Sequence, residues 1–278
     1  MTSTSLIPFN KFRFTNLEEI LKVLEKALGQ LGVDFYLIGA LARDIQLMGV
    51  YGIESPRATE DVDMAVMVND IQTYHRLLQS LTSYFKFTEV NEPYRLEYKD
   101  GTWVDFLPFG EIESEDRKVK IGKRRIVELS LIGLRENLEY AKEIQFEDGF
   151  KIKVATLAGI CLLKFFAWNS QPVQREHDIR DISFILDKYI NIYEDEVFEL
   201  HNDLLDDGWS DTLGARILGR HIKNILIKEQ KTRTKLLSIL ESSLTYDSPL
   251  PIIFTRLNNK TITENIEMLK QIITGIRE

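Results

Sequence analysis

Two short stretches decide the fold of this chain: FYLIGALARD at residues 35–44 and DVDMAVMV at residues 61–68. The first is an apolar run rich in β-forming residues that ends on Gly39, and it predicts a buried strand that turns sharply into a helix. The second alternates between polar and apolar residues, as a strand does. Side chains two apart in a strand project from one face, with Cα atoms about 6.5 Å apart, so Asp61 and Asp63 are expected to lie together. Two carboxylates that close can share a divalent cation.

Helices and further strands are predicted on both sides of these stretches. Residues 16–29 carry apolar residues at helical spacing, with Asn16 as the N-cap and Gly29 as the end of the helix. The other predictions for the first half are a helix at 71–85, strands at 87–90, 94–98 and 102–109, and a hairpin turn at Asp100-Gly101. This pattern favours a mixed sheet covered by helices, an α/β (α+β) fold.

Asp105 supplies a third carboxylate, within the predicted strand at residues 102–109. An acid flanked by Val104 and Phe106 is poorly accommodated in a core unless a cation offsets its desolvation. Mg²⁺ is commonly held by one or two carboxylates together with substrate phosphates, and paired metals stabilise both the attacking and the leaving oxygen of an in-line displacement. The alternative is that the D-V-D strand lies at a sheet edge with both acids in solvent.

Gly39 stands where the first predicted strand ends and a helix begins. A residue without Cβ lets backbone N–H groups at a helix N-terminus approach a phosphate closely, so a triphosphate fits here. A single glycine at such a junction is also an ordinary turn. The order of the motifs is more informative: the glycine turn, Arg43 and Asp44 on the helix, TEDVD at residues 59–63, and a further strand acid at Asp105.

This order resembles that of the DNA polymerase β-like nucleotidyltransferase superfamily over roughly residues 35–109. G-A-x-x-R-D followed by T-x-D-V-D is similar to the variant shared by tRNA CCA-adding enzymes and the abortive-infection (AbiEii-like, type IV) toxin nucleotidyltransferases. The resemblance implies a nucleotidyltransferase fold with three catalytic carboxylates, Asp61, Asp63 and Asp105, that bind two Mg²⁺ ions. It also implies that Asp105 helps to activate the attacking hydroxyl.

The resemblance further implies contacts to the NTP substrate. In the first half they involve Gly39, Ala40, Arg43 and Thr59. The family usually has glycine or serine at the position of Ala40, whose methyl group cannot donate a hydrogen bond. A phosphate at this position therefore has to rely on backbone N–H groups.

The resemblance continues in the second half of the chain, around Lys164. The run LLKFFAW, followed by HDIRDI at residues 177–182, is similar to the helical lysine and K-D-x-x-D-L elements of the AbiEii-like group, and it favours that group over the CCA-adding enzymes. Among apolar neighbours an ammonium must snorkel, pair with an acid or meet a ligand anion, for which a β- or γ-phosphate is suitable. Asp178 and Asp181 lie three apart and share a helix face, so Asp178 is expected to hold Lys164 when no phosphate is bound. The alternatives are a snorkelling lysine and a solvated acidic face.

Length and composition place the chain among globular proteins. With 278 residues, 44% hydrophobic and 28% charged, it forms one large domain or two modest ones. The net charge of −8 means that any nucleic-acid contact must be local. The one cysteine, Cys161, lies in an apolar helical pattern and predicts a small buried side chain, and the four histidines show no metal-ligand spacing, so no zinc site is expected. No signal peptide or membrane span is expected, which favours a cytoplasmic protein.

The residue pattern changes near Lys151, and beyond this residue long helical patterns follow one another. No proline- or glycine-rich linker separates the two halves. We therefore expect a nucleotidyltransferase catalytic domain at residues 1–150 and a helical domain at residues 151–278 that completes the nucleotide pocket.

Two consecutive segments of opposite charge lie in the second half. Residues 194–211 contain eight acids and no lysine or arginine, whereas residues 216–235 contain seven lysines or arginines and one acid. Arg216, Arg220 and Lys223 recur at helical spacing and form a candidate stripe for the phosphates of an RNA acceptor. The alternative is that they pair with the preceding acidic segment.

The sequence thus predicts an enzyme that transfers a nucleoside monophosphate from an NTP to a hydroxyl and releases pyrophosphate. By resemblance the acceptor is RNA, tRNA in particular, and an antitoxin protein is a candidate partner. Two alternatives stay open: a small-molecule (aminoglycoside-type) nucleotidyltransferase, and a nucleotide-binding regulatory module with little turnover.

Overall fold

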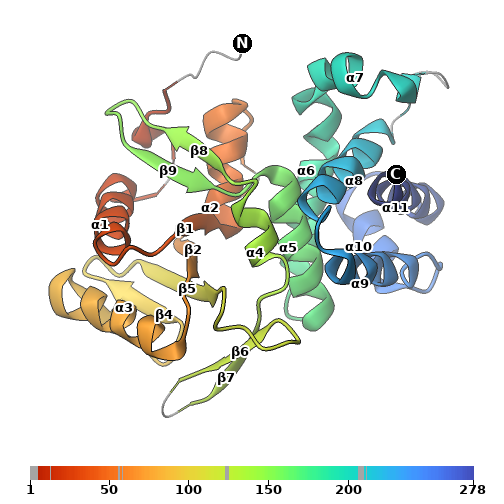
Figure 1. The fold of residues 1–278 in the computed structure, drawn as a ribbon. Coiled ribbons are helices and arrows are strands. Elements are labelled where there is room, and N and C mark those ends of the chain that lie inside the picture. The colour runs from red at the N-terminus through yellow and green to blue at the C-terminus, as the bar shows by residue number, and fades with distance from the viewer. Residues whose placement is uncertain are drawn as a thin grey trace. The chain divides into compact units, whose positions relative to one another are not determined.

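The computed structural model describes residues 6–12, 14–55, 57, 59–122, 125–205, 210 and 212–278. The chain divides into two compact units, Met1–Thr156 and Leu157–Glu278 (Figure 1). Each unit has its own set of buried apolar side chains.

A mixed sheet forms the centre of the first unit. Among the described residues it has seven strands in the order β3-β4-β5-β2-β1-β9-β8 (Figure 1). These strands are β1 Phe35–Ile38, β2 Asp61–Met67, β3 Phe87–Glu89, β4 Arg95–Tyr98, β5 Trp103–Phe109, β8 Lys142–Gln145 and β9 Lys151–Val154. A separate two-stranded sheet is made of β6 Lys118–Ile121 and β7 Val127–Ser130. The predicted mixed sheet is confirmed, as are the strands that carry the acids.

The strand β2 lies between two partners of opposite direction. It runs antiparallel to β1 and parallel to β5. Its residues Val62, Met64, Ala65 and Val66 are fully buried, which is typical of a central strand covered on both faces. The alternative of a solvated edge strand is therefore wrong. The hairpin predicted at Asp100-Gly101 joins β4 to β5, with Gly101 in the left-handed region at φ 89°.

The helices of the first unit are η1 Phe9–Lys11, α1 Leu17–Gln30, α2 Gly39–Asp44, the π-helical η2 Ile45–Val50, α3 Ile71–Tyr84 and α4 Leu134–Leu138. The predicted first helix differs from α1 at both ends. Asn16 occupies the N-cap position, but its side chain makes no capping bond and instead donates to Asp100 Oδ2 at 3.0 Å. At the other end the helix passes Gly29, and Gly32 adopts the left-handed conformation.

The strand β9 extends the first unit beyond the boundary expected at residue 150. It pairs with β1 in parallel and with β8 in antiparallel fashion. Gln46 donates from Nε2 to the carbonyl of Ala155 at 2.9 Å and so fixes the end of this strand to the helix after β1. The change from strand to helix therefore comes at Leu157 rather than at Lys151.

The described part of the second unit contains helices and no strand (Figure 1). They are α5 Leu157–Ser170, α6 Glu176–Ile192, α7 Glu194–Leu200, η3 Asn202–Leu205, α8 Leu213–Ile225, α9 Gln230–Glu241, α10 Pro249–Leu257 and α11 Ile262–Arg277. Two of them, α8 and α11, cross at a pair of glycines: a Cβ atom at Gly219 would lie 2.9 Å from Cα of Gly275. Across the described residues of both units, none of the helices combines the length and apolar character needed to cross a membrane.

Candidate active site

Three carboxylates lie together on neighbouring strands of the first unit. In the parallel pair of β2 and β5, Asp63 is directly opposite Asp105 and Asp61 is opposite Trp103. Asp61 and Asp63 are half-buried on either side of the fully buried Val62, as expected for one face of a strand. Asp105 is buried.

Gly39 lies directly against this carboxylate cluster. It follows Ile38, which pairs with Asp63 across β1 and β2, and it begins α2 with φ at 71°. A Cβ atom at this position would lie 2.7 Å from Cγ of Asp63 and would overlap its Oδ2. Glycine is therefore required here because the Asp63 side chain occupies the space that any other residue would fill. Ala40, the second residue of α2, is half-buried.

Arg95 brings a positive charge into the cluster. From β4 its Nε donates to Asp105 Oδ1 at 2.6 Å and its Nη2 donates to Asp105 Oδ2 at 2.9 Å, while Asp61 Oδ2 lies 3.9 Å away. The guanidinium also lies over the ring of Trp103, 4.6 Å from its centroid. Sequence reasoning missed this residue, although the hairpin turn at Asp100-Gly101 sets a register in which Arg95 faces Asp105.

The electrostatics of the cluster differ between its members. Burial raises the pKa of Asp61 above its usual value, Arg95 works against that shift, and Asp105 adds to it. The hydrogen bonds that Arg95 donates to Asp105 raise the pKa of Arg95, so its guanidinium is permanently charged. The donor set consists of carboxylate oxygens alone and fits Mg²⁺, which prefers oxygen ligands.

Arg43 and Thr59, the other residues expected at the nucleotide, make hydrogen bonds to residues close to them in the chain. Arg43 is fully buried and donates from Nε to Asp44 Oδ1 at 2.8 Å, and from Nη2 to Ser55 Oγ at 3.0 Å and the Arg57 carbonyl at 3.3 Å. Thr59 donates from Oγ1 to the carbonyl of Asp61 at 3.4 Å. These bonds fix the segment that leads into β2. A contact of either side chain with the nucleotide stays a prediction.

Lys164 is held by two buried acids in the second unit. Its Nζ lies 2.7 Å from Asp178 Oδ1 and 2.8 Å from Asp181 Oδ2, and both acids are fully buried. Arg175 Nε donates to the other oxygen of Asp178 at 2.6 Å. The expected pair with Asp178 is confirmed, and Asp181 completes a group in which two cations face two anions. A snorkelling lysine and a solvated acidic face are both wrong.

Arg216 and Arg220, two members of the expected RNA stripe, are engaged with acids. Arg216 donates from Nε to Glu278 Oε1 at 2.8 Å, and Arg220 bonds the same carboxylate. Arg220 Nη1 also donates to Asp203 Oδ1 at 2.8 Å. Part of the acidic segment, residues 206–209 and 211, lies outside the described residues. The alternative of pairing with the preceding acidic segment is confirmed for Arg220, through Asp203, whereas Arg216 pairs with Glu278, which lies outside that segment.

Two histidines and an acid lie together in the second unit, which the sequence spacing did not indicate. Glu196, His201 and His221 each present a ligand atom within 4.8 Å of the others. Arg220 Nη1 lies 3.2 Å from His201 Nδ1, and because arginine can only donate, the proton of the neutral ring is on Nε2. Burial, with His221 and Arg220 nearby, lowers the pKa of His201 and favours this neutral form. His201 Nδ1 faces Arg220, whereas His201 Nε2 is buried and has no hydrogen-bond partner among the described residues.

Cys161 is fully buried on α5, as predicted from its apolar pattern. Burial raises the pKa of its thiol well above the usual range. A thiol that stays protonated is inert as a nucleophile.

A family model matches most of the chain. The family described as "Nucleotidyl transferase AbiEii toxin, Type IV TA system" matches residues 22–217, a range that includes the carboxylates, Gly39, Lys164 and Asp178. No curated protein matches the sequence.

Several solved structures are similar at low identity. The lincomycin-bound lincosamide antibiotic adenylyltransferase LnuA is 17% identical, over 52% of this chain and 84% of that one, with a TM-score of 0.32. A CCA-adding enzyme with CTP is 11% identical, over 91% and 69%, with a TM-score of 0.33. The Bradyrhizobium diazoefficiens CD-NTase CdnG in complex with GTP is 13% identical, over 98% and 87%, with a TM-score of 0.29.

Proposed function

Because this chain belongs to the AbiEii nucleotidyl transferase toxin family, we propose that it moves a nucleoside monophosphate from an NTP to an acceptor hydroxyl and releases pyrophosphate. The observation that carries the proposal is the register pair of Asp63 and Asp105, with Gly39 directly against it. The pair would give a metal site on two adjacent strands, and the glycine lets the Asp63 carboxylate lie directly against the start of α2, where backbone N–H groups can meet a phosphate.

The reaction is an in-line displacement at the α-phosphorus. The acceptor oxygen forms a new bond to phosphorus, and the bond from phosphorus to the oxygen bridging the α- and β-phosphates breaks, so its electron pair leaves with pyrophosphate. Two Mg²⁺ ions held by Asp61, Asp63 and Asp105 would supply positive charge to the attacking and leaving oxygens. Asp105 takes the proton of the acceptor hydroxyl.

Arg95 has a defined part in this scheme. Its two hydrogen bonds to Asp105 orient that carboxylate before substrates arrive. The two bonds use one lone pair on each Asp105 oxygen, and the remaining lone pairs would be the ones that hold a metal ion or take a proton. Arg95 is therefore a positioning residue for Asp105.

We further propose that the acceptor is an RNA, with tRNA as the first candidate, and that an antitoxin protein restrains the enzyme in the cytoplasm. Membership in a family described as a type IV toxin–antitoxin system supports the antitoxin partner. The basic composition of residues 216–235 supports a polyanionic acceptor.

The test is pyrophosphate release with each of the four NTPs, Mg²⁺ and unfractionated tRNA. Wild-type chain should release pyrophosphate and label the tRNA, Asp63→Asn should do neither, and Asp187→Asn, which removes an exposed acid of the second unit, should behave as wild type. Saturable NTP binding without pyrophosphate from any NTP would mean a regulatory nucleotide-binding module and would overturn the proposal.

A further inference from the structure

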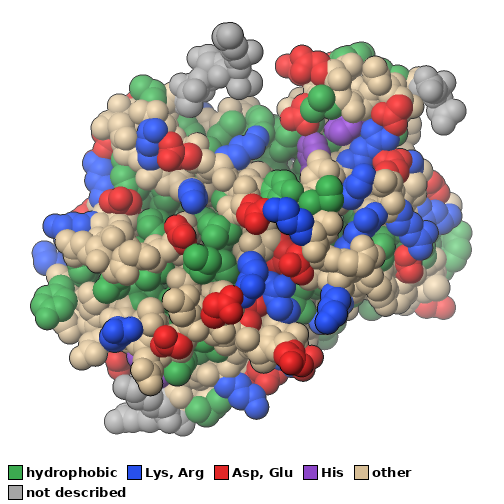
Figure 2. Space-filling view, in the orientation of Figure 1, with side chains coloured by type: hydrophobic (Ala, Val, Ile, Leu, Met, Phe, Trp, Pro, Cys, Tyr) green, Lys and Arg blue, Asp and Glu red, His purple; other side chains and the backbone are tan. Residues whose placement is uncertain are grey.

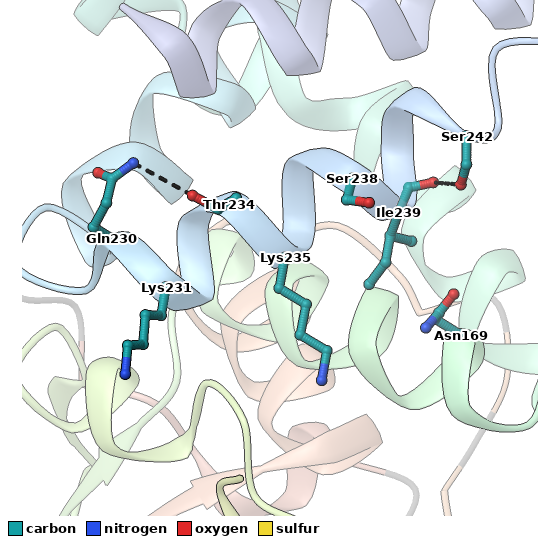
Figure 3. A pocket seen from close by; sticks show the side chains of 8 residues that line it. All are labelled: Asn169, Gln230, Lys231, Thr234, Lys235, Ser238, Ile239 and Ser242. Carbon is teal, nitrogen blue, oxygen red and sulfur yellow. Dashed lines mark hydrogen bonds between the residues drawn. The ribbon is translucent and has the colours of Figure 1, made fainter. Parts of the chain in front are cut away.

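One face of α9 carries a stripe of polar side chains above an open hollow. Lys231 and Lys235 lie one helical turn apart and extend from the same face of the helix (Figure 3). Thr234, Ser238 and Ser242 follow one another at intervals of four residues. Together with Asn169 of α5, these side chains line a hollow of about 660 Å³. The lining offers ammonium, hydroxyl and amide groups and no carboxylate.

The two lysines differ from the arginines of α8 in their charge balance. Figure 2 shows basic side chains gathered over α8 and α9. Arg216 and Arg220 are neutralised by Glu278 and Asp203. Lys231 and Lys235 are exposed, and within the described residues neither makes an ion pair. Their charge is therefore available to a ligand.

The chemistry of this face fits a phosphodiester strand. Ammonium groups bind phosphates as point charges, and hydroxyl and amide groups complete the contact to phosphate and sugar oxygens. From Gln230 to Ser242 the lining covers about 18 Å at 1.5 Å per helical residue. A stripe of that length is longer than one triphosphate and matches several consecutive phosphates of a strand.

We propose that the α9 face, Lys231 and Lys235 with Thr234, Ser238 and Asn169, binds the phosphate backbone of the RNA acceptor. The inference rests on the proposed function, because it names where the acceptor of that reaction is held. It moves the RNA contact expected at Arg216, Arg220 and Lys223 to Lys231 and Lys235, which make no ion pair within the described residues.

The experiment measures binding of unfractionated tRNA to full-length chain that carries Asp63→Asn, so that transfer does not alter the RNA. Adding Lys231→Gln with Lys235→Gln should raise the Kd for tRNA at least tenfold and reduce the slope of log affinity against log salt by about 2, since each lysine–phosphate contact contributes about 1. The matched control removes two exposed lysines of the first unit, Lys142→Gln with Lys151→Gln, and should leave both quantities unchanged.

Three outcomes would overturn the assignment: equal loss of tRNA affinity in the control, no loss in the Lys231 and Lys235 double variant, or a larger effect of Arg216→Gln with Arg220→Gln. A second binding experiment distinguishes tRNA phosphates from the triphosphate of the NTP as the ligand of the α9 face. Binding of Mg²⁺ and ATP by the Lys231 and Lys235 variant in the wild-type background should be unchanged, and a loss there would assign the face to the triphosphate and overturn the RNA site.

The same experiments distinguish a failure of the α9 site from a failure of the proposed function. Pyrophosphate release without tRNA binding by any variant would leave the transferase standing and overturn the α9 site. Binding of tRNA that depends on Lys231 and Lys235, with no NMP transferred to tRNA, would support the site and overturn RNA as the acceptor.

Discussion

Nε of Arg95 lies 2.6 Å from Oδ1 of Asp105, and Nη2 of the same guanidinium lies 2.9 Å from Oδ2. This two-point bond places a fixed positive charge inside a cluster of three acids. The carboxylates would repel one another without a cation, and the cation that a nucleotidyltransferase needs there is exchangeable. We therefore expect Arg95 to keep the fold stable without metal, and Mg²⁺ to compete with it for Asp105.

Replacing Arg95 should make stability depend on metal. Arg95→Met leaves Asp105 buried without its partner, and loss of hydrogen bonds to a charged group should lower the free energy of unfolding by about 2 kcal/mol without Mg²⁺. Added Mg²⁺ should restore more stability to the variant than to wild type. Urea unfolding with and without Mg²⁺ measures both. Arg95→Lys keeps the charge but loses the two-point geometry, so its free energy of unfolding should lie between those of wild type and Arg95→Met. An Arg95→Met variant whose stability does not change with Mg²⁺ would contradict the prediction.

Removing the first two acids should separate binding from folding. Asp61→Asn with Asp63→Asn should abolish Mg²⁺-dependent NTP binding, measured by calorimetry, and leave the fold intact. Burial raises the pKa of Asp61, so the ionised form of this side chain opposes folding at neutral pH. The contribution of Asp61 to the free energy of unfolding should therefore increase as the pH falls through the raised pKa. Asp61→Asn should therefore be at least as stable as wild type at pH 7. Unchanged Mg²⁺-dependent binding in the double variant would show that these acids are not the metal ligands.

Asp105 should act on turnover more than on binding. Asp105→Asn keeps one acceptor for Arg95 but loses the base, so kcat for pyrophosphate release should fall at least a hundredfold while NTP affinity changes only a few-fold. Single-turnover kinetics beside equilibrium NTP binding give the comparison. Equal losses in the two quantities would instead assign Asp105 to nucleotide binding.

Gly39 should tolerate no side chain. Gly39→Ala strains a residue at φ 71° by about 1–2 kcal/mol and displaces the Asp63 carboxylate, so transfer should be lost while the chain still folds. Gly32→Ala is the matched control, because Gly32 has φ 62° and open space around the position of a Cβ atom. The control should lose similar stability and keep its activity. Full activity in Gly39→Ala would disprove the close packing against Asp63.

Lys164 should be needed for folding as well as for any phosphate contact. Lys164→Met leaves Asp178 to Arg175 and removes the Lys164 cation from Asp181, and breaking a buried ion pair on one side costs about 3–5 kcal/mol. Lys164→Met with Asp181→Asn should recover part of that stability. In this double variant, triphosphate binding should weaken more than nucleoside binding, by about 1.5–3 kcal/mol, if the lysine meets phosphate. Equal effects on the two ligands would leave Lys164 a purely structural residue.

Local patterns were enough for much of the site, since they depend only on neighbours in the chain. The period of two put Asp61 and Asp63 on one face, and the strand-to-helix junction located Gly39. Arg95 was missed because its role arises from pairing between strands. The charge balance of Arg216 was not determined by the sequence either, because its acid partner Glu278 lies 62 residues further along the chain, directly after α11.

The parallel pairing of β2 with β5 also determines the point during synthesis and folding at which the three acids can come together. Parallel neighbours cannot be joined by a tight turn, and here α3 and the strands β3 and β4 intervene. A chain still being synthesised has both Asp61 and Asp63 long before Asp105 can take its place beside them. A ribosome-bound fragment that ends before Asp105 therefore lacks the complete acid set. The proposed transfer activity would therefore arise only after β5 has been made and has paired with β2.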